Sequence, residues 1–271
     1  GHHVVVLGVR VAGDGSPILM IPGWSQTAAM FKHQLDGLSA NHRVYAMDLR
    51  GHGDSSKIES GYTIERLTLD LRHIIESYDL HNLTLLGHSM GNQILWNYWQ
   101  NYGPDRIRGL IIAEQPASLV SSPTWSKNEI QNAGSLFTHE ELQETCQNLK
   151  SDQAEQVTRA MLTNMIDSTI SSREFDWIVS ENLKFPRHLA ADYLWTCAPD
   201  DWRHVIETIE LPTLVISGRD SLVPWQSQAW IQQQIQGSDL NIFEPDDGGC
   251  HFMFLANPDR FNQAVVDFLP Q

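Results

Sequence analysis

The sequence predicts an α/β fold with a mostly parallel central sheet flanked by helices. Short apolar runs recur along the 271 residues, separated by segments with helical spacing. This pattern is typical of parallel strands covered by helices on both faces. One such run leads directly into a Gly-x-Ser-x-Gly turn at 87–91 and then into a helical segment. The stretch between Glu114 and Thr213 contains no strand-like run, which indicates a long helical insertion.

Seven segments have the composition of buried strands. They are rich in Val, Ile, Leu or Met, and turn residues such as Gly, Pro and Asp separate each of them from the next segment. The expected strands are 4–11, 18–21, 44–47, 83–86, 110–114, 213–217 and 240–243. Helical periodicity appears at 28–38, 63–78 and 92–99, and Thr63 is an acceptable N-cap for the second of these helices.

The insertion is expected to contain only helices. Thr138-His139-Glu140-Glu141 is a capping-box pattern at the start of one of them. An insertion after a central strand is most economically a cap over the carboxyl ends of the strands, where open α/β sheets place their sites. We therefore expect a core of residues 1–116 and 206–271 and a helical cap of residues 117–205. The expected cap helices are 126–136, 139–149, 153–165, 172–183 and 187–194.

The turn at 87–91 has the strand–turn–helix context of a nucleophile elbow. Such a turn forces its central residue, here Ser89, into a strained backbone conformation that lifts the hydroxyl above the sheet edge. Gly87 and Gly91 fit because a Cβ at either position would collide with the neighbouring strand and helix. Ser89 is therefore predicted to be a nucleophile.

Composition excludes several kinds of partner. The net charge of −15, from 33 acidic and 18 basic residues, argues against nucleic acid or an anionic membrane surface, since both require clustered Lys and Arg. No apolar run reaches the roughly 18 residues of a membrane span, and no secretion leader is recognisable. Cys146, Cys197 and Cys250 suggest neither a disulfide framework nor a zinc motif. We expect a small-molecule substrate, no metal or other cofactor, and a cytoplasmic location; the oligomeric state is left open.

A serine nucleophile requires a base and an acid, which on this architecture follow it in the order Ser, acid, His. His251 follows the last strand in a loop that contains two glycines, and it is the expected base. Asp220 follows the preceding strand in Gly-Arg-Asp, and it is the expected acid. Glu114 is the rival acid, because it also ends a strand, one nearer the elbow.

Two backbone N–H groups are expected to stabilise the oxyanion. One belongs to Met90, the residue after the nucleophile. The other is expected from the loop after strand 18–21, where Pro22 has no N–H and Gly23 permits close backbone approach. That leaves the N–H of Trp24.

Four motifs together resemble the α/β-hydrolase family. They are Gly-His-Ser-Met-Gly at 87–91, Asp-Leu-Arg-Gly-His-Gly-Asp-Ser at 48–55, Gly-Arg-Asp-x-x-Val-Pro at 218–224, and His251. The resemblance covers about residues 18–118 and 211–269. It implies the α/β-hydrolase fold and a triad of Ser89, Asp220 and His251. The stretch 48–55 is expected to brace the loop beneath the site rather than to take part in the chemistry.

One feature departs from the common pattern of that family. Most members carry His-Gly before the oxyanion residue, whereas this chain has Pro22-Gly23-Trp24. That variant resembles the cofactor-free quinolone dioxygenases of the same fold, whose acid follows the strand that ends here at Glu114. Some lactonases place a Glu at that point too. Glu114 therefore stays open as the acid, and so does a non-hydrolytic activity.

The cap is expected to select the substrate. Its Trp and Met residues indicate an apolar or aromatic ligand, since such pockets bind mainly by burying carbon surface. The expected activity is hydrolysis of an ester or lactone through an acyl-enzyme. The alternatives are a cofactor-free dioxygenase or perhydrolase, a carbon–carbon bond hydrolase, and a signalling protein that binds its ligand with little turnover. Candidate pocket walls are Trp125, Phe137, Met161, Met165, Trp177 and Trp195.

Overall fold

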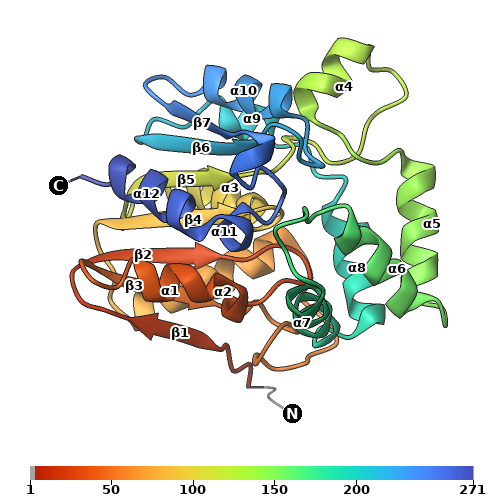
Figure 1. Cartoon of the computed structure of the whole chain (residues 1–271), viewed down its shortest axis with the longest axis horizontal. Coiled ribbons are helices and arrows are strands. Elements are labelled where there is room, and N and C mark those ends of the chain that lie inside the picture. The colour runs from red at the N-terminus through yellow and green to blue at the C-terminus, as the bar shows by residue number, and fades with distance from the viewer. Residues whose placement is uncertain (1–3, 271) are drawn as a thin grey trace.

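The computed structural model describes residues 4–270, and its centre is one seven-stranded sheet of order β1-β3-β2-β4-β5-β6-β7. All pairings are parallel except that of β1 with β3 (Figure 1). The predicted α/β architecture with a mostly parallel sheet is confirmed. The strands are β1 Val9–Ala12, β2 Ser16–Ile21, β3 His42–Met47, β4 Leu83–His88, β5 Ile107–Ala113, β6 Thr213–Gly218 and β7 Asp239–Phe243.

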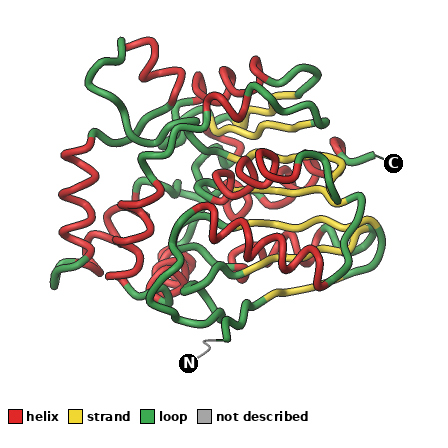
Figure 2. Tube along the Cα trace, turned by 180° about the vertical axis from the view of Figure 1, so that it is seen from behind, coloured by secondary structure: helices red, strands yellow, loops and turns green. Residues whose placement is uncertain are grey.

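The sheet separates two hydrophobic clusters, because successive side chains of a strand point to opposite faces. Along β2, Ile18 and Met20 belong to one cluster, while Leu19 and Ile21 belong to the other. Helices cover both faces (Figures 1 and 2). The core helices are η1 Ala28–Phe31, α1 Lys32–Gly37, α2 Ile64–Ser77, α3 Gly91–Tyr102, α10 Trp225–Gln234, η2 Pro245–Asp247, α11 Met253–Ala256 and α12 Pro258–Phe268.

Helix α2 shows how the sequence sets its own boundaries. Thr63 caps it, because its side chain accepts a hydrogen bond from the backbone N–H of Arg66. Leu67, Leu71 and Ile74 recur at helical spacing and are buried in the cluster that contains Leu19. The predicted helix and its N-cap are confirmed.

The strand predicted at 4–11 is largely wrong, because β1 begins only at Val9. Val4 and Val6 are 80% and 62% exposed, so no core face holds this segment against the sheet. Its backbone bonds the 48–56 loop instead: the N–H of Val6 donates to the Ser56 hydroxyl at 2.8 Å, and that of Gly8 donates to the Ser55 hydroxyl at 2.8 Å. The apolar run is therefore mostly an extended edge segment.

Between β5 and β6 the described chain forms helices and no strand, as expected. The capping box at Thr138 and Glu141 is present, and a second one joins Ser126 to Glu129. The helix expected at 126–136 is shorter, because Gly134 at φ 73° ends it in the left-handed region. The insertion helices are α4 Lys127–Ala133, α5 His139–Leu149, α6 Ala154–Thr163, α7 Ser172–Leu183, α8 Arg187–Cys197 and α9 Arg203–Ile206.

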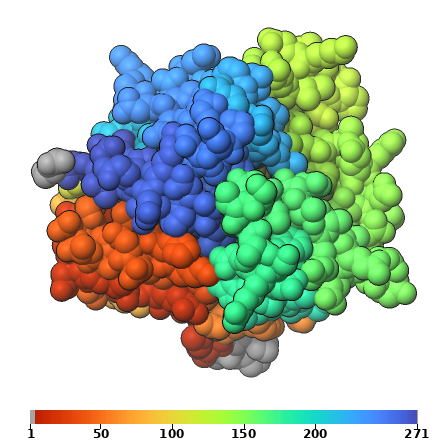
Figure 3. Space-filling view, viewed as in Figure 1, coloured from red at the N-terminus to blue at the C-terminus, as the bar shows by residue number. Residues whose placement is uncertain are grey.

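Helices α5 to α8 stand together beside the sheet, at the right in Figure 1. The space-filling view shows this part, in green, seated against both the N-terminal and the C-terminal portions of the core (Figure 3). The arrangement supports the proposal that residues 117–205 form a cap on a core of 1–116 and 206–271. Residues 1–3 and 271 of that division lie outside the described part of the chain.

Candidate active site

The elbow at the end of β4 places Ser89 in the left-handed region, with φ 55°. The two glycines of the turn leave no room for a side chain. A Cβ on Gly91 would lie 2.3 Å from the carbonyl oxygen of Ile21, and one on Gly87 would lie 2.4 Å from Oδ1 of Asn92. The strained conformation predicted for Ser89 is present, and Ser89 lines the cavity described below.

His251 meets Ser89 from the loop after η2. Its Nε2 lies 3.0 Å from the Ser89 Oγ, and the residue is only 3% exposed. The two glycines before it allow the loop to turn tightly, since a Cβ on Gly249 would lie 2.4 Å from the Phe243 carbonyl oxygen. His88 holds the loop from beneath by donating from Nε2 to the His251 carbonyl oxygen at 2.8 Å. The serine and the histidine are therefore in hydrogen-bond contact, as the sequence predicts.

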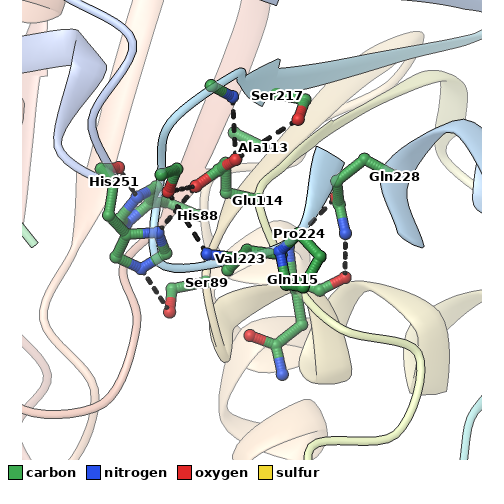
Figure 4. Close-up of polar contacts among 12 residues, drawn as sticks. His88, Ser89, Ala113, Glu114, Gln115, Ser217, Val223, Pro224, Gln228 and His251 are labelled. Carbon is green, nitrogen blue, oxygen red and sulfur yellow. Dashed lines mark hydrogen bonds and ion pairs between the residues drawn. The ribbon is translucent and has the colours of Figure 1, made fainter. Parts of the chain in front are cut away.

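The acid beside the histidine is Glu114 and not Asp220. Oε1 of Glu114 lies 3.0 Å from Nδ1 of His251, and Glu114 is completely buried (Figure 4). Asp220 is exposed, and no hydrogen bond joins it to His251 in the described structure. The expectation that the Asp220 carboxylate lies beside the histidine is wrong, and the rival residue occupies that place.

The carboxyl end of β6 and the loop after it, here called the β6 tip, explain why Glu114 and not Asp220 lies beside His251. Instead of supplying a carboxylate, the β6 tip donates hydrogen bonds to Glu114: the N–H of Gly218 at 2.8 Å, the hydroxyl of Ser217 at 3.4 Å, and the hydroxyl of Ser221 at closer range. A Cβ on Gly218 would lie 2.0 Å from the carbonyl oxygen of Gly249, so this tip is packed against the histidine loop. The chain then turns outward and leaves Asp220 on the surface.

Burial shifts both members of the acid–histidine pair toward their neutral forms. It raises the pKa of Glu114 to about 8, against the hydrogen bonds from Gly218, Ser221 and Ser217, which lower it. It also lowers the pKa of His251 to about 4, so this imidazole is a free base at neutral pH. A neutral imidazole whose Nδ1–H points at Glu114 leaves Nε2 free to accept the Ser89 proton.

The loop after β2 passes directly against the elbow. A Cβ on Gly23 would lie 2.9 Å from the Cβ of Ser89 and 3.3 Å from the N of Met90, so only glycine fits. Trp24 and Met90 both line the cavity next to Ser89. Within residues 4–270 the N–H groups of these two residues have no hydrogen-bond acceptor outside regular helix and strand pairings. Both are thus available to a ligand oxygen, as the oxyanion expectation requires.

Ser89 and His251 open onto a cavity of about 230 Å³ with a mostly apolar wall. Phe137, Met161 and Met165, three of the six residues suggested from the sequence, line it. The core contributes Leu222 and Val223 from the loop after β6. The other lining residues are Trp24, Gln26, Met90, Gln115, Pro116, Leu119, Leu136, Thr145, Asn164 and Leu194.

The three insertion tryptophans suggested as pocket walls lie elsewhere. Trp125 stacks with the Arg203 guanidinium at 4.3 Å, and Trp177 lies beneath the Lys32 ammonium at 4.0 Å. Trp195 is 50% exposed. On α8 it is Leu194 that faces the cavity, and the next residue of a helix points about 100° away. Aromatic content alone does not show which face of a helix a residue occupies.

Polar cavity residues were missed from the sequence. Gln26 and Gln115 are 5% and 1% exposed and bring amide groups to an otherwise apolar wall. Gln228 fixes Gln115 by pairing with its backbone, donating to its carbonyl oxygen at 2.9 Å and accepting from its N–H at 3.3 Å. The one available signal was position, since Gln115 directly follows Glu114 at a strand end.

The 48–55 stretch braces the site, as expected, and does not line the cavity. Asp48 accepts a hydrogen bond from the N–H of Ala28 at 2.8 Å. Arg50 forms a buried two-point pair with Asp70, at 2.7 and 2.9 Å. Such contacts fix loop geometry, which is a structural role.

Within residues 4–270 no group of three or more His, Cys, Asp or Glu side chains is arranged to hold a metal ion. The three cysteines are unpaired and buried. No helix in this range has the length and hydropathy of a membrane span.

Known proteins share the fold of this chain. A family description of the alpha/beta hydrolase fold matches residues 16–258. The chain is 26% identical to a non-heme chloroperoxidase of Kitasatospora aureofaciens, over 95% of this chain and 93% of the relative. A bromoperoxidase of Bacillus anthracis superposes with a TM-score of 0.89 at 23% identity, over 97% of this chain and 95% of the other. An esterase of Exiguobacterium antarcticum superposes with a TM-score of 0.88 at 24% identity, over 97% and 94%.

Proposed function

Because the chain belongs to the α/β hydrolase fold family, and is an enzyme of that family, we propose that it hydrolyses an ester or lactone bond through Ser89, His251 and Glu114. One observation carries the proposal. A continuous hydrogen-bonded path runs from the Ser89 hydroxyl through His251 to the buried Glu114 carboxylate, and its serine end lies in an apolar cavity. The serine also occupies the strained turn that this chemistry uses.

In the first half-reaction the Ser89 Oγ attacks the carbonyl carbon while its proton passes to Nε2 of His251. The carbonyl π electrons move onto oxygen, where the N–H groups of Trp24 and Met90 stabilise the negative charge. Glu114 accepts a hydrogen bond from the Nδ1–H and so stabilises the imidazolium as it forms. Collapse of the intermediate breaks the bond to the leaving alcohol, which takes the proton from Nε2.

In the second half-reaction His251 removes a proton from water as the water oxygen attacks the acyl-enzyme. The same two N–H groups receive the second oxyanion. Collapse breaks the bond to Ser89, which recovers its proton, and the acid is released. In a lactone the leaving alcohol remains attached to the acyl group, so one product leaves instead of two.

The cavity indicates the size and polarity of the acyl group. Its volume of about 230 Å³ is below the usual range for drug-sized ligands. Leu119, Phe137 and Met161 present carbon surface, and among the cavity-lining residues no Lys or Arg provides a charge for an anionic group. We propose a small apolar or aromatic acyl group, with residues 117–205 acting as the cap that encloses it.

Covalent labelling tests the proposal directly. A fluorophosphonate should modify Ser89 stoichiometrically, as located by peptide mass spectrometry, and p-nitrophenyl esters should be turned over with a preference for short acyl chains. Ser89→Ala should abolish the label and lower kcat by several powers of ten. Turnover that survives this substitution, or a label on another residue, would overturn the assignment.

A second candidate is perhydrolysis, which the name of the related chloroperoxidase favours. Here hydrogen peroxide replaces water in the second half-reaction, so the acyl group leaves Ser89 as a peracid and the serine recovers its proton. The two candidates share the acyl-enzyme. Peracid formation from an ester and hydrogen peroxide, at a rate that exceeds hydrolysis, would select perhydrolysis.

A further inference from the structure

Four consecutive residues beside the nucleophile are each bonded to the insertion. Trp24 donates from Nε1 to the Ala190 carbonyl oxygen at 2.8 Å, and this bond is buried. The next three side chains continue the series along the segment from the end of α7 to the start of α8. The partners are Ser25 with Arg187 at 3.1 Å, Gln26 with Asn182 at 3.1 Å, and Thr27 with Glu181 at 2.8 Å.

Arg187 lies at the centre of this contact. Its guanidinium donates to the hydroxyls of Ser25 and Thr158, both at 3.1 Å, and to the carbonyl oxygens of Asn182 at 2.6 Å and Phe185 at 2.8 Å. One side chain therefore joins helix α6, the turn between α7 and α8, and the loop beside the elbow. No carboxylate lies within 4.0 Å of it in the described structure.

Arg187 is partly buried. Removing part of the hydration of a cation that has no carboxylate partner is costly, so its neutral acceptors must compensate for that loss. Burial lowers the pKa of Arg187 to about 10, which still leaves the side chain charged at neutral pH. Most charged side chains of this kind find a carboxylate. This one instead binds carbonyl and hydroxyl groups that must all be in place at once, so its binding depends on correct assembly of the insertion and the loop.

The core holds the same loop from the opposite side. The N–H of Ser25 donates to Nε2 of His52 at 2.9 Å, and the N–H of Ala28 donates to Asp48 at 2.8 Å. Burial lowers the pKa of His52 to about 3, so this imidazole remains an acceptor. Ser25 has φ 63°, a conformation that a serine rarely adopts unless its surroundings impose it.

We infer that Arg187 is a positioning residue that fixes the backbone of residues 24–27 through its contact with Ser25. The N–H of Trp24 therefore points at the oxyanion only while the insertion is docked on the core. The inference rests on the proposed function for the role of that N–H. Docking of the insertion then does more than enclose the substrate, since it completes the catalytic geometry. An enzyme with an undocked insertion would keep Ser89, His251 and Glu114 in contact and still be slow.

Arg187→Met is the test, with Arg159→Met as the matched control. Arg159 is also an insertion arginine, but it is partly exposed and pairs with Asp176 on α7 at 2.9 Å, without touching the loop. For p-nitrophenyl ester hydrolysis, Arg187→Met should lower kcat about 10- to 100-fold with KM little changed, because an oxyanion donor acts in the transition state. A boronic acid, which forms a tetrahedral adduct, should bind weaker by a similar factor, whereas the product acid should bind as before.

Hydrogen exchange of the peptide that contains residues 22–28 provides a readout independent of turnover. It should speed up in Arg187→Met and stay at the wild-type rate in Arg159→Met. Ser25→Ala removes the contact between Ser25 and Arg187 with a smaller change of side chain. If Arg187→Met does not fold, kcat of Ser25→Ala for the same ester tests the inference in its place. The inference is overturned if hydrogen exchange is unchanged in a folded Arg187→Met. It is also overturned if Arg187→Met or Ser25→Ala keeps the wild-type kcat. A wild-type enzyme that neither labels nor turns over esters refutes the proposed function instead, while the exchange rates still decide whether Arg187 holds the loop.

Discussion

Replacing Glu114 with Gln should separate the two carboxylates that the sequence offers as the acid. Every neighbour that the structure shows on the Glu114 carboxylate is able to donate: Nδ1 of His251, the N–H of Gly218, and the hydroxyls of Ser217 and Ser221. The Gly218 N–H can only donate, so the oxygen of an amide must face it, and the amide NH₂ then takes the side that faces His251 and Ser221. Because that NH₂ faces His251, the imidazole must present a lone pair at Nδ1 and carry its proton on Nε2.

A proton on Nε2 prevents this atom from accepting the Ser89 hydroxyl. In a serine protease the corresponding Asp-to-Asn change lowers kcat about 10⁴-fold through the wrong tautomer. We therefore expect Glu114→Gln to lower kcat by about 10³- to 10⁴-fold, equivalent to about 4–5.5 kcal/mol of transition-state stabilisation. The effect should be seen in kcat for a p-nitrophenyl ester at saturation, with the thermal midpoint measured in parallel.

Asp220→Asn is the matched control, since it makes the same chemical change in an exposed side chain on the adjoining strand tip. It should keep kcat within about twofold, because a surface substitution away from the site has little effect. The reasoning would be refuted if Asp220→Asn lost as much activity as Glu114→Gln, or if Glu114→Gln kept more than a tenth of the wild-type rate while remaining folded.

Other parts of the structure support three more predictions. Gly23→Ala should lower kcat at least 100-fold with a folded circular-dichroism spectrum, because the added Cβ would lie 2.9 Å from the Cβ of Ser89 and displace the oxyanion loop; wild-type kcat would contradict the close approach. Asp70→Asn should lower the free energy of unfolding in urea by about 3–5 kcal/mol, since it breaks the buried pair with Arg50, and a loss below 1 kcal/mol would argue against that pair. The pKa of Glu114, raised to about 8, means that the ionised acid accumulates only as pH rises through that value, so kcat/KM should still increase between pH 7 and 9; a plateau from pH 6.5 would show that this ionisation does not limit the rate.

The sequence predicts the central strands of the sheet well because they are buried on both faces. β4 and β6 are buried along their whole length, so both are short segments dominated by apolar residues. The prediction fails at the edge, where Val4 and Val6 have the composition of a strand but no core to face. It also fails for pocket walls such as Trp195, because helical periodicity shows which residues share a face and not what that face contacts.

The identity of the acid could not be predicted for a geometric reason. β5 and β6 are neighbouring parallel strands, with Ala113 opposite Ile216, so residues that follow either strand emerge side by side at the same edge. Both Glu114 and Asp220 lie between Ser89 and His251 in the chain, and each closely follows the end of a strand. Chain order and distance from a strand end therefore do not distinguish them as the acid. The difference lies in backbone conformation: Glu114 has φ 53° and turns its side chain inward, where three groups from the β6 tip bind it. A strained φ held by neighbours from a distant part of the chain is a property of the assembled fold. Residue type and spacing therefore limit the acid to two candidates, and the packing of the β6 tip determines which of them contacts the histidine.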